Sequence, residues 1–194
     1  MPEKHLFVDT NVFLDFYTLT KEDIEELRKL VTLVSEGTLA LYVSEQVRNE
    51  FRRNRDKKLR DTINQFKEAF RILEVPSLAR EYEEYEQLSE AVTSYQYYYA
   101  RILDQFIEDA KQHELNADYL IEDLLRVCYF IGHTEDIYNR ATKRVYLGDP
   151  PGKNYSTGDA VNWLSLLQEV PDGSDLYFIG GDKDFSSGID TNTF

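Results

Sequence analysis

Apolar residues along this chain occur either in short unbroken runs or in longer stretches with helical spacing. The runs at 6–8, 39–43 and 176–181 have the length and composition of buried strands. Between the first two, apolar positions recur three and four residues apart over 24–34, which predicts an amphipathic helix ended by Gly37. A strand, a helix and a second strand in this order predict a parallel sheet.

The middle of the chain, from about 55 to 146, is dominated by helical spacing. One apolar stripe covers 63–73, and a second covers 85–106 after a break at Pro76. A third stripe continues over 119–131. We therefore expect a largely helical insertion within a single α/β domain.

The composition is that of a globular protein, since 14 Tyr and 11 Phe can fill a core. No apolar run approaches the roughly 18 residues of a membrane span, and the first residues lack the apolar region of a signal peptide. We therefore expect a cytoplasmic protein that does not contact a membrane. The only cysteine, Cys128, excludes an internal disulfide, and its helical surroundings predict a small buried side chain.

The formal net charge of −14 argues against general affinity for nucleic acids, because binding phosphates requires cations. The charge is unevenly distributed, however. Seven Lys and Arg residues crowd the stretch 48–60, whereas acidic residues concentrate at 81–87. The basic stretch fits a nucleic-acid-binding face and an ordinary solvated helix face equally well.

Several carboxylates lie where a predicted strand ends or a predicted helix begins. Asp9 follows the first strand, Asp159 opens a helix, and Asp182 follows the last strand, with Asp184 two residues further on. Glu50 lies on a predicted helix. Each alone also fits a turn, a helix cap or a helix surface. Together they predict a cluster at the carboxyl edge of the sheet, where Mg²⁺ or Mn²⁺ would relieve their repulsion. That pattern favours a metal-dependent enzyme acting on phosphodiesters.

The motifs around these acids resemble those of PIN-domain nucleases, and more narrowly the PIN-like branch with a long helical insertion. VDTNVFLD resembles the first motif, VRNEF the second, GDAVNW the third and GGDKDF the fourth. The resemblance implies a three-layer α/β/α sandwich with a central parallel sheet, one or two Mg²⁺ or Mn²⁺ ions, and hydrolysis of RNA or flap-type DNA. Carried over by position, it implies a catalytic and metal-binding set of Asp9, Glu50, Asp159 and Asp182, with Asp184 as a further metal ligand.

Two features depart from the family pattern. Gly180 stands where the fourth motif commonly carries a Thr or Ser, so a hydroxyl that could orient a water is missing. The chain also stops nine residues after Phe185, where many members continue, which suggests a fragment of a longer protein. Neither departure removes a carboxylate.

The resemblance and the charge pattern together predict the contacts with substrate. Thr10 and Asn11 would shape the first carboxylate turn, and Arg48, Arg52 and Lys153 would contact phosphates. We expect residues 1–194 to form one PIN-like domain that acts as an endoribonuclease on single-stranded RNA, in preference to DNA. The helical insertion is a predicted surface for a homodimer or another protein partner.

Other functions fit the pattern less well. A phosphatase of the haloacid-dehalogenase type requires a second Asp at the position of Asn11. A phosphorelay receiver requires adjacent acids and a late strand-end Lys, which are not convincingly placed. A non-catalytic PIN-like binding module remains an alternative, although such a module has no need for four gathered carboxylates. A DNA-directed nuclease is the other alternative.

Overall fold

A computed structural model of the chain describes residues 4–18, 21–149, 151 and 156–180. Within this part of the chain four strands form one sheet in the order β3-β2-β1-β4, and every neighbouring pair is parallel. The strands are β1 (Lys4–Val8), β2 (Leu39–Ser44), β3 (Tyr129–Ile131) and β4 (Leu176–Ile179).

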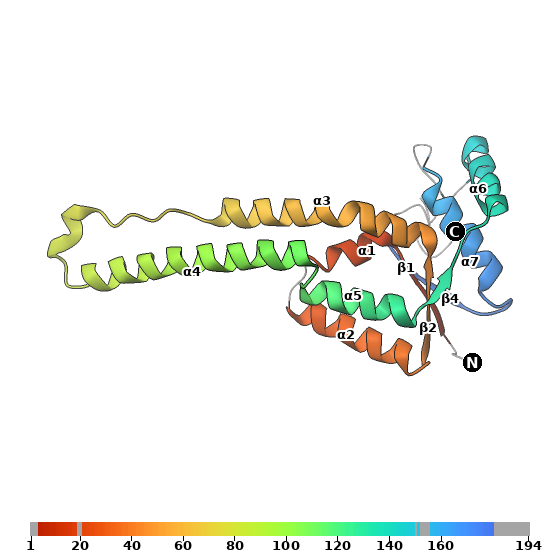
Figure 1. The fold of residues 1–194 in the computed structure, drawn as a ribbon, viewed down its shortest axis with the longest axis horizontal. Coiled ribbons are helices and arrows are strands. Elements are labelled where there is room, and N and C mark those ends of the chain that lie inside the picture. The colour runs from red at the N-terminus through yellow and green to blue at the C-terminus, as the bar shows by residue number, and fades with distance from the viewer. Residues whose placement is uncertain (1–3, 19–20, 150, 152–155, 181–194) are drawn as a thin grey trace, which may run out of the picture.

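Helices cover both faces of the sheet, as Figure 1 shows. The helices of the described residues are α1 (Thr10–Asp15), α2 (Lys21–Ser35), α3 (Glu45–Ala69), the short 3-10 helix η1 (Ser77–Glu81), α4 (Tyr85–Gln112), α5 (Asn116–Val127), α6 (Glu135–Leu147) and α7 (Gly158–Glu169). On one face lie α1, α2, α5 and the first half of α3, and on the other lie α6 and α7. The predicted three-layer α/β/α sandwich with a parallel sheet is confirmed.

The central strands are apolar over 6–8 of β1 and 39–43 of β2, because both of their faces are covered there. Phe7 of β1 is fully buried and pairs in register with Tyr42 of β2 and Phe178 of β4. The Phe7 and Phe178 rings lie 4.8 Å apart. The strands predicted from the three apolar runs are therefore present, although β4 ends at Ile179 and excludes Gly180.

The predicted helix over 119–131 is partly wrong. Helix α5 ends at Val127, and the next residues form the edge strand β3 beside β2. Apolar spacing did not reveal this switch because a three-residue strand is too short to show a period of its own. Cys128 lies between the two elements in an extended conformation and is half-buried, not fully buried as expected. Burial raises the pKa of its thiol.

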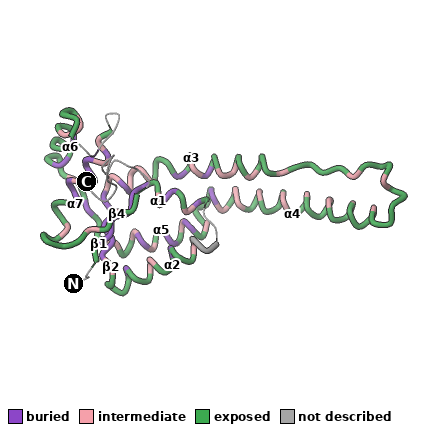
Figure 2. The backbone as a smooth tube through the Cα atoms, turned by 180° about the vertical axis from the view of Figure 1, so that it is seen from behind, coloured by how far each residue is buried: buried purple, intermediate pink, exposed green. Residues whose placement is uncertain are grey.

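The second half of α3 and all of α4 leave the sandwich as a long two-helix projection, seen in Figures 1 and 2. We call residues 60–112 the arm. Its two helices pack through aromatic rings, such as Phe66 against Tyr99 at 4.6 Å between ring centroids. At the far end α3 stops at Ala69, and η1 follows Pro76, where the sequence predicted a break.

A buried cluster fixes the root of the arm to the sandwich. Arg55 of α3 is only 4% exposed and donates to both carboxylate oxygens of Asp118 on α5, each at 2.8 Å. It also donates to the backbone oxygen of Ala110 on α4 at 3.0 Å. The Tyr17 hydroxyl donates to Asp118 at 2.6 Å. We call Tyr17, Arg55 and Asp118 the Arg55 cluster; it joins the end of α1 to three other helices.

No helix in the described ranges combines the length and the apolar character that crossing a membrane requires.

Candidate active site

Asp9 occupies the turn between β1 and α1, at the carboxyl end of the central strand. Its backbone N–H donates to the Ile179 oxygen at 2.8 Å, so the pairing of β1 with β4 extends to this residue. Asp9 is 8% exposed, and its carboxylate accepts a hydrogen bond from the Asn11 side chain at 3.3 Å. Although Asp9 is the N-cap residue of α1, its side chain makes no capping hydrogen bond. A helix cap therefore does not explain this carboxylate.

Glu50 faces the same turn from the second turn of α3. The helix begins at the end of β2, where the Ser44 hydroxyl accepts a hydrogen bond from the Val47 N–H at 3.1 Å. The Thr10 hydroxyl donates to one oxygen of Glu50 at 3.0 Å, and the Gln46 side-chain amide donates to the other at 2.6 Å. The residue after Asp9 thus holds the second predicted carboxylate in place.

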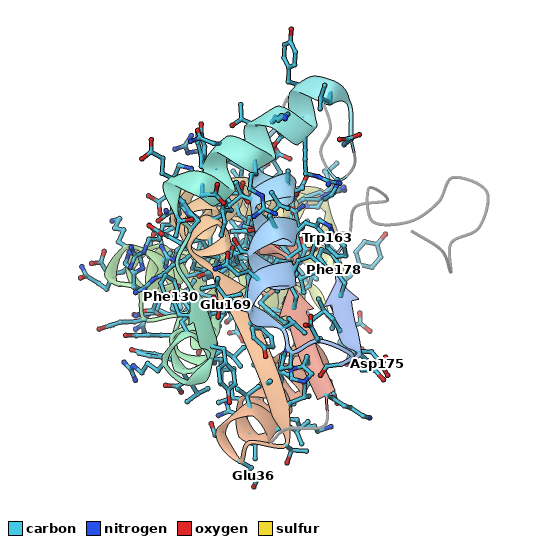
Figure 3. All side chains as sticks on the ribbon, turned by 90° about the vertical axis from the view of Figure 1, so that its right-hand side faces the viewer. Glu36, Phe130, Trp163, Glu169, Asp175 and Phe178 are labelled. Carbon is cyan, nitrogen blue, oxygen red and sulfur yellow. The ribbon has the colours of Figure 1, made fainter. Side chains whose placement is uncertain are left out.

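Asp159 lies in the first turn of α7, next to a glycine that packs against Glu50. A Cβ atom on Gly158 would lie 2.7 Å from Glu50 Oε1 and 2.9 Å from Gln46 Nε2, which is closer than side-chain atoms approach. Figure 3 shows α7 running opposite to the strands in front of the sheet, so its first residues lie at the strands' carboxyl ends. The structure therefore brings the start of the third motif to Glu50.

The chain passes Asp9 again after β4. A Cβ atom on Gly180 would lie 3.4 Å from Asp9 Cβ and 2.8 Å from the Phe178 ring. This crowding is a physical reason for glycine where the family pattern commonly has Thr or Ser. The next residues lead to Asp182 and Asp184, which lie outside the described residues, as does Lys153.

The described carboxylates have the chemistry of a site for a hard divalent cation. Asp9, Glu50 and Asp159 offer only oxygen ligands, which Mg²⁺ and Mn²⁺ prefer. Each Glu50 oxygen keeps acceptor capacity after its one hydrogen bond. Within the described ranges no three acidic, histidine or cysteine side chains lie close enough together to hold a metal. A site here would draw on the predicted ligands beyond residue 180 as well.

Comparison with known protein families agrees with this arrangement. A PIN domain family model matches residues 6–185, which is nearly the whole chain and includes all four motifs.

The chain belongs to the PIN-domain family.

Searches of the curated proteins and of the solved structures gave no match. PIN domains are generally nucleases that bind nucleic acid and use divalent metal ions.

In this PIN domain, two of the predicted phosphate contacts do not lie beside the carboxylates. Arg48 and Arg52 line a cavity of about 490 Å³ between α3 and α5, whose wall includes Ile121 and Leu125. The Arg48 guanidinium also lies over the Phe130 ring of β3, 5.6 Å from its centroid. The spacing explains this placement. Residues two positions before and after Glu50 point to nearly the opposite side of a helix from Glu50 itself.

Two other cations share the face of Glu50. Arg53 and Lys57 follow it by three and seven residues, which is the spacing of one helix face. Both are exposed, and neither forms an ion pair with a residue that the structure describes. Sequence reasoning missed them because it treated the basic stretch as a whole and did not divide it by helical period.

Sequence reasoning also missed the residues that hold the site together. Gln46 orients Glu50, and the Ser44 hydroxyl donates to the Asn162 side chain at 2.5 Å, which joins the start of α3 to α7. Both Ser44 and Asn162 are buried. Asn162 belongs to the third motif, GDAVNW, so its position in that motif was the available signal.

Proposed function

We propose that this PIN domain is a cytoplasmic, Mg²⁺- or Mn²⁺-dependent nuclease that cleaves single-stranded RNA internally. One observation carries the proposal above all: Thr10, the residue after Asp9, bonds to Glu50, and Gly158, the residue before Asp159, packs against the same Glu50. Three motifs separated by up to 150 residues therefore meet at the carboxyl edge of the sheet, where open α/β folds bind their ligands.

In this proposal Asp9, Glu50, Asp159 and Asp182 would hold the metal, with Asp184 as a further ligand. The bound metal would polarise a phosphoryl oxygen and lower the pKa of a bound water. Thr10 and Gln46 fix the orientation of the Glu50 carboxylate, and Asn11 does the same for Asp9. Held in this way, the carboxylates need little rearrangement when a substrate binds.

The exposed face of α3 supplies the path for the substrate backbone. Arg53 and Lys57 extend from Glu50 along the helix. An RNA strand that reaches the carboxylates can therefore place phosphates against both cations. Arg48 and Arg52 would contact phosphates only if the RNA strand also reached the far side of α3. Lys153 stays a predicted phosphate contact. This local positive charge offsets the overall net charge of −14.

A cleavage assay tests the proposal. Single-stranded RNA and DNA of the same mixed sequence, closed into circles to exclude attack at the ends, are incubated with Mg²⁺, Mn²⁺ or EDTA. We expect cleavage of the RNA circle with either metal and none with EDTA. Cleavage of the DNA circle alone would reassign the substrate. Tight binding of RNA without cleavage under any condition would identify a non-catalytic binding module.

A further inference from the structure

A row of exposed polar residues continues from Glu50 along α3 and onto the arm. Its members are spaced alternately four and three residues apart, which keeps them on one face of the helix. Four are cations, one is an amide, and all are exposed. We call this row the basic stripe: Arg53, Lys57, Arg60, Asn64 and Lys67. Because α3 runs unbroken from the sheet into the arm (Figure 1), the stripe leads outward from the carboxylates.

The cations of the basic stripe differ from exposed cations on the other helices because they have no acidic partner. Arg28, Arg126 and Arg140 each form an ion pair with an acid three or four residues earlier in the chain. None of the four stripe cations pairs with a residue that the structure describes. Like charges four residues apart, as in Arg53 and Lys57, destabilise a helix. Helix stability therefore does not explain the stripe.

One edge of the basic stripe borders a groove of about 490 Å³ between α3 and α4, which we call the arm groove. Its floor is apolar and consists of Leu59 and Ile63 of α3 and Ile107 of α4. Leu59 is buried and the two isoleucines are half-buried. Three exposed stripe residues form the rim: Arg60, Asn64 and Lys67. An apolar floor beside cations and an amide fits a flat ring with polar edges, such as a nucleobase.

The acids near the arm groove leave its rim positive. Asp56 lines the groove, but the Arg55 guanidinium lies 3.4 Å from its carboxylate. Glu108 of α4 lies outside the groove and accepts two hydrogen bonds from its own helix. By helical phase, Asp61 and Glu68 of α3 lie on the side of the stripe away from the groove. The rim therefore sets two unpaired cations against one partly neutralised acid.

The geometry points to a track for single-stranded RNA that runs from the carboxylates along the basic stripe, with one base of the strand in the arm groove. The inference rests on the proposed function because it takes RNA as the ligand. A phosphate backbone carries the regular negative charge that a row of cations requires. A single strand, unlike a duplex, has bases that are free to enter a groove. Continuity with Glu50 favours the substrate strand over an acidic protein as the occupant.

The length of the basic stripe sets how much of the strand it can hold. Lys67 follows Glu50 by 17 residues. At the rise of an α-helix this separation is roughly 26 Å. A strand stacked as in duplex DNA carries a phosphate about every 3.4 Å, and an extended strand carries fewer, so at most about eight nucleotides cover the stripe. The substrate is therefore a strand with an unpaired segment of this length on one side of the cleaved bond.

Salt titration of RNA binding by the full chain tests the track. Arg60→Gln combined with Lys67→Gln should weaken binding of a labelled single strand. It should also reduce the slope of log K against log salt concentration by roughly 1.4, the value for two phosphate contacts. The control is Arg28→Gln combined with Lys29→Gln, which removes the same charge from an exposed surface of α2 and should leave the slope unchanged.

Three results of this titration would overturn the track. The first is an unchanged slope in the arm variant, or an equal loss in the α2 control. The second is an equal loss of binding to a duplex of the same sequence, which would show that the stripe does not select single strands. The third is displacement of the RNA by polyglutamate at an equal concentration of charge, which would show a general surface for anions.

Disulfide crosslinking in a Cys128→Ser background locates the base. Asn64→Cys places a thiol at the rim of the arm groove, and Thr32→Cys places one on α2 as the control. Each RNA in a series carries one thiol-bearing base, at a different position in the strand. After mild oxidation, one or two adjacent positions should crosslink to the Asn64→Cys protein and none to the control. Crosslinking at every position, or at none, would contradict a base in the groove.

These measurements separate the track from the nuclease proposal, because neither of them requires cleavage. RNA cleavage by a protein whose arm variant binds RNA normally would support the nuclease proposal and reject the track. Binding that depends on the arm, without cleavage under any metal condition, would support the track and reject the nuclease proposal.

Discussion

At the residue scale, the most informative contact is the hydrogen bond from Thr10 to Glu50, because it joins the first motif to the second. We expect Thr10→Val to keep the shape of the side chain and to lower the cleavage rate about 10- to 100-fold, as the loss of a ligand-orienting partner typically does. The loss of one hydrogen bond should lower the free energy of unfolding by only about 1 kcal/mol.

The control is Thr32→Val on α2. The Thr32 hydroxyl donates to the backbone oxygen of Arg28 on an exposed surface of α2, a helix that carries none of the predicted site residues. The cleavage rate at steady state and the free energy of unfolding in urea are compared between the two variants. Unchanged activity of the Thr10→Val protein would show that Glu50 does not depend on this contact.

A second residue-scale prediction concerns Gly158. In Gly158→Ala the new Cβ would approach Glu50 Oε1 to 2.7 Å, so Glu50 or the start of α7 must move. Overpacking should lower the free energy of unfolding by about 1–3 kcal/mol. We expect the cleavage rate to fall by more than this destabilisation explains, because the displaced carboxylate is a predicted metal ligand. Gly132→Ala is the matched control, because its nearest neighbour would be 4.0 Å away. Equal cleavage by the two proteins would contradict a role for the close approach.

The site residues differ in how well the sequence revealed them. The positions of Asp9 and Asp159 follow from strand ends and helix starts, which local patterns predict. The contact between Thr10 and Glu50 joins segments 40 residues apart and arises only when α3 packs on α1. Arg48 and Arg52 were grouped with Glu50 because of their charge. Their helical phase sets them apart from it.

At the element scale, the exposed face of α3 provides a prediction about substrate binding. Arg53→Gln combined with Lys57→Gln should weaken RNA binding, and should reduce the slope of log K against log salt concentration by roughly 1.4, the value for two phosphate contacts to a single strand. Arg48→Gln combined with Arg52→Gln is the matched comparison, with the same charge change on the other side of the helix.

Fluorescence anisotropy with a labelled RNA, over a series of salt concentrations, gives both slopes. A larger effect from the Arg48 and Arg52 pair would show that the RNA strand passes through the cavity between α3 and α5, and would support the phosphate contacts predicted from the sequence.

The Arg55 cluster is the second element-scale feature, because it joins the arm to the sandwich. Burial, followed by the bond to Asp118, raises the pKa of Tyr17 above its usual value of 10.0. The folded protein therefore holds this proton more firmly than the unfolded chain does. The stability that results is present below pH 10.0 and is lost as the pH rises towards the raised pKa.

We expect Tyr17→Phe to unfold more readily than the wild-type protein at neutral pH, by about 1 kcal/mol. This difference should shrink as the pH rises above 10.0, because the unfolded wild-type chain then loses the Tyr17 proton that the folded protein keeps, which favours unfolding of the wild-type protein alone. Urea unfolding at neutral pH and at a pH above 10.0 measures the change. The control is Tyr119→Phe, which changes an exposed tyrosine of α5. A difference that is independent of pH would contradict this role for Tyr17.

At the scale of the whole molecule, the sandwich and the arm were predictable to different degrees. Alternating strand and helix patterns predicted the parallel sheet, and the apolar runs located β1, β2 and β4. Strand β3 was missed because its three residues continue the apolar spacing of α5. The helical character of α4 was clear from its periodicity. Its projection from the sandwich could not be seen, because apolar spacing indicates which face of a helix packs but not which element it packs against.

The central claim, a metal-dependent catalytic site, depends on the gathered carboxylates. Neutral isosteres at Asp9 or Asp159 relieve the repulsion among these groups and remove a charged metal ligand. The Asp9→Asn protein should therefore be as stable as the wild-type protein in EDTA, or more stable. It should gain less from Mn²⁺, because a ligand that binds only the folded state stabilises it less when the ligand binds more weakly.

The most direct test is to measure melting temperature and RNA cleavage together for the wild-type, Asp9→Asn and Asp159→Asn proteins, each with Mn²⁺ and with EDTA. We predict that Mn²⁺ raises the melting temperature of the wild-type protein and permits cleavage, and that both variants lose the cleavage and most of the rise. A wild-type protein that shows neither a metal-dependent rise in melting temperature nor metal-dependent cleavage would contradict the account.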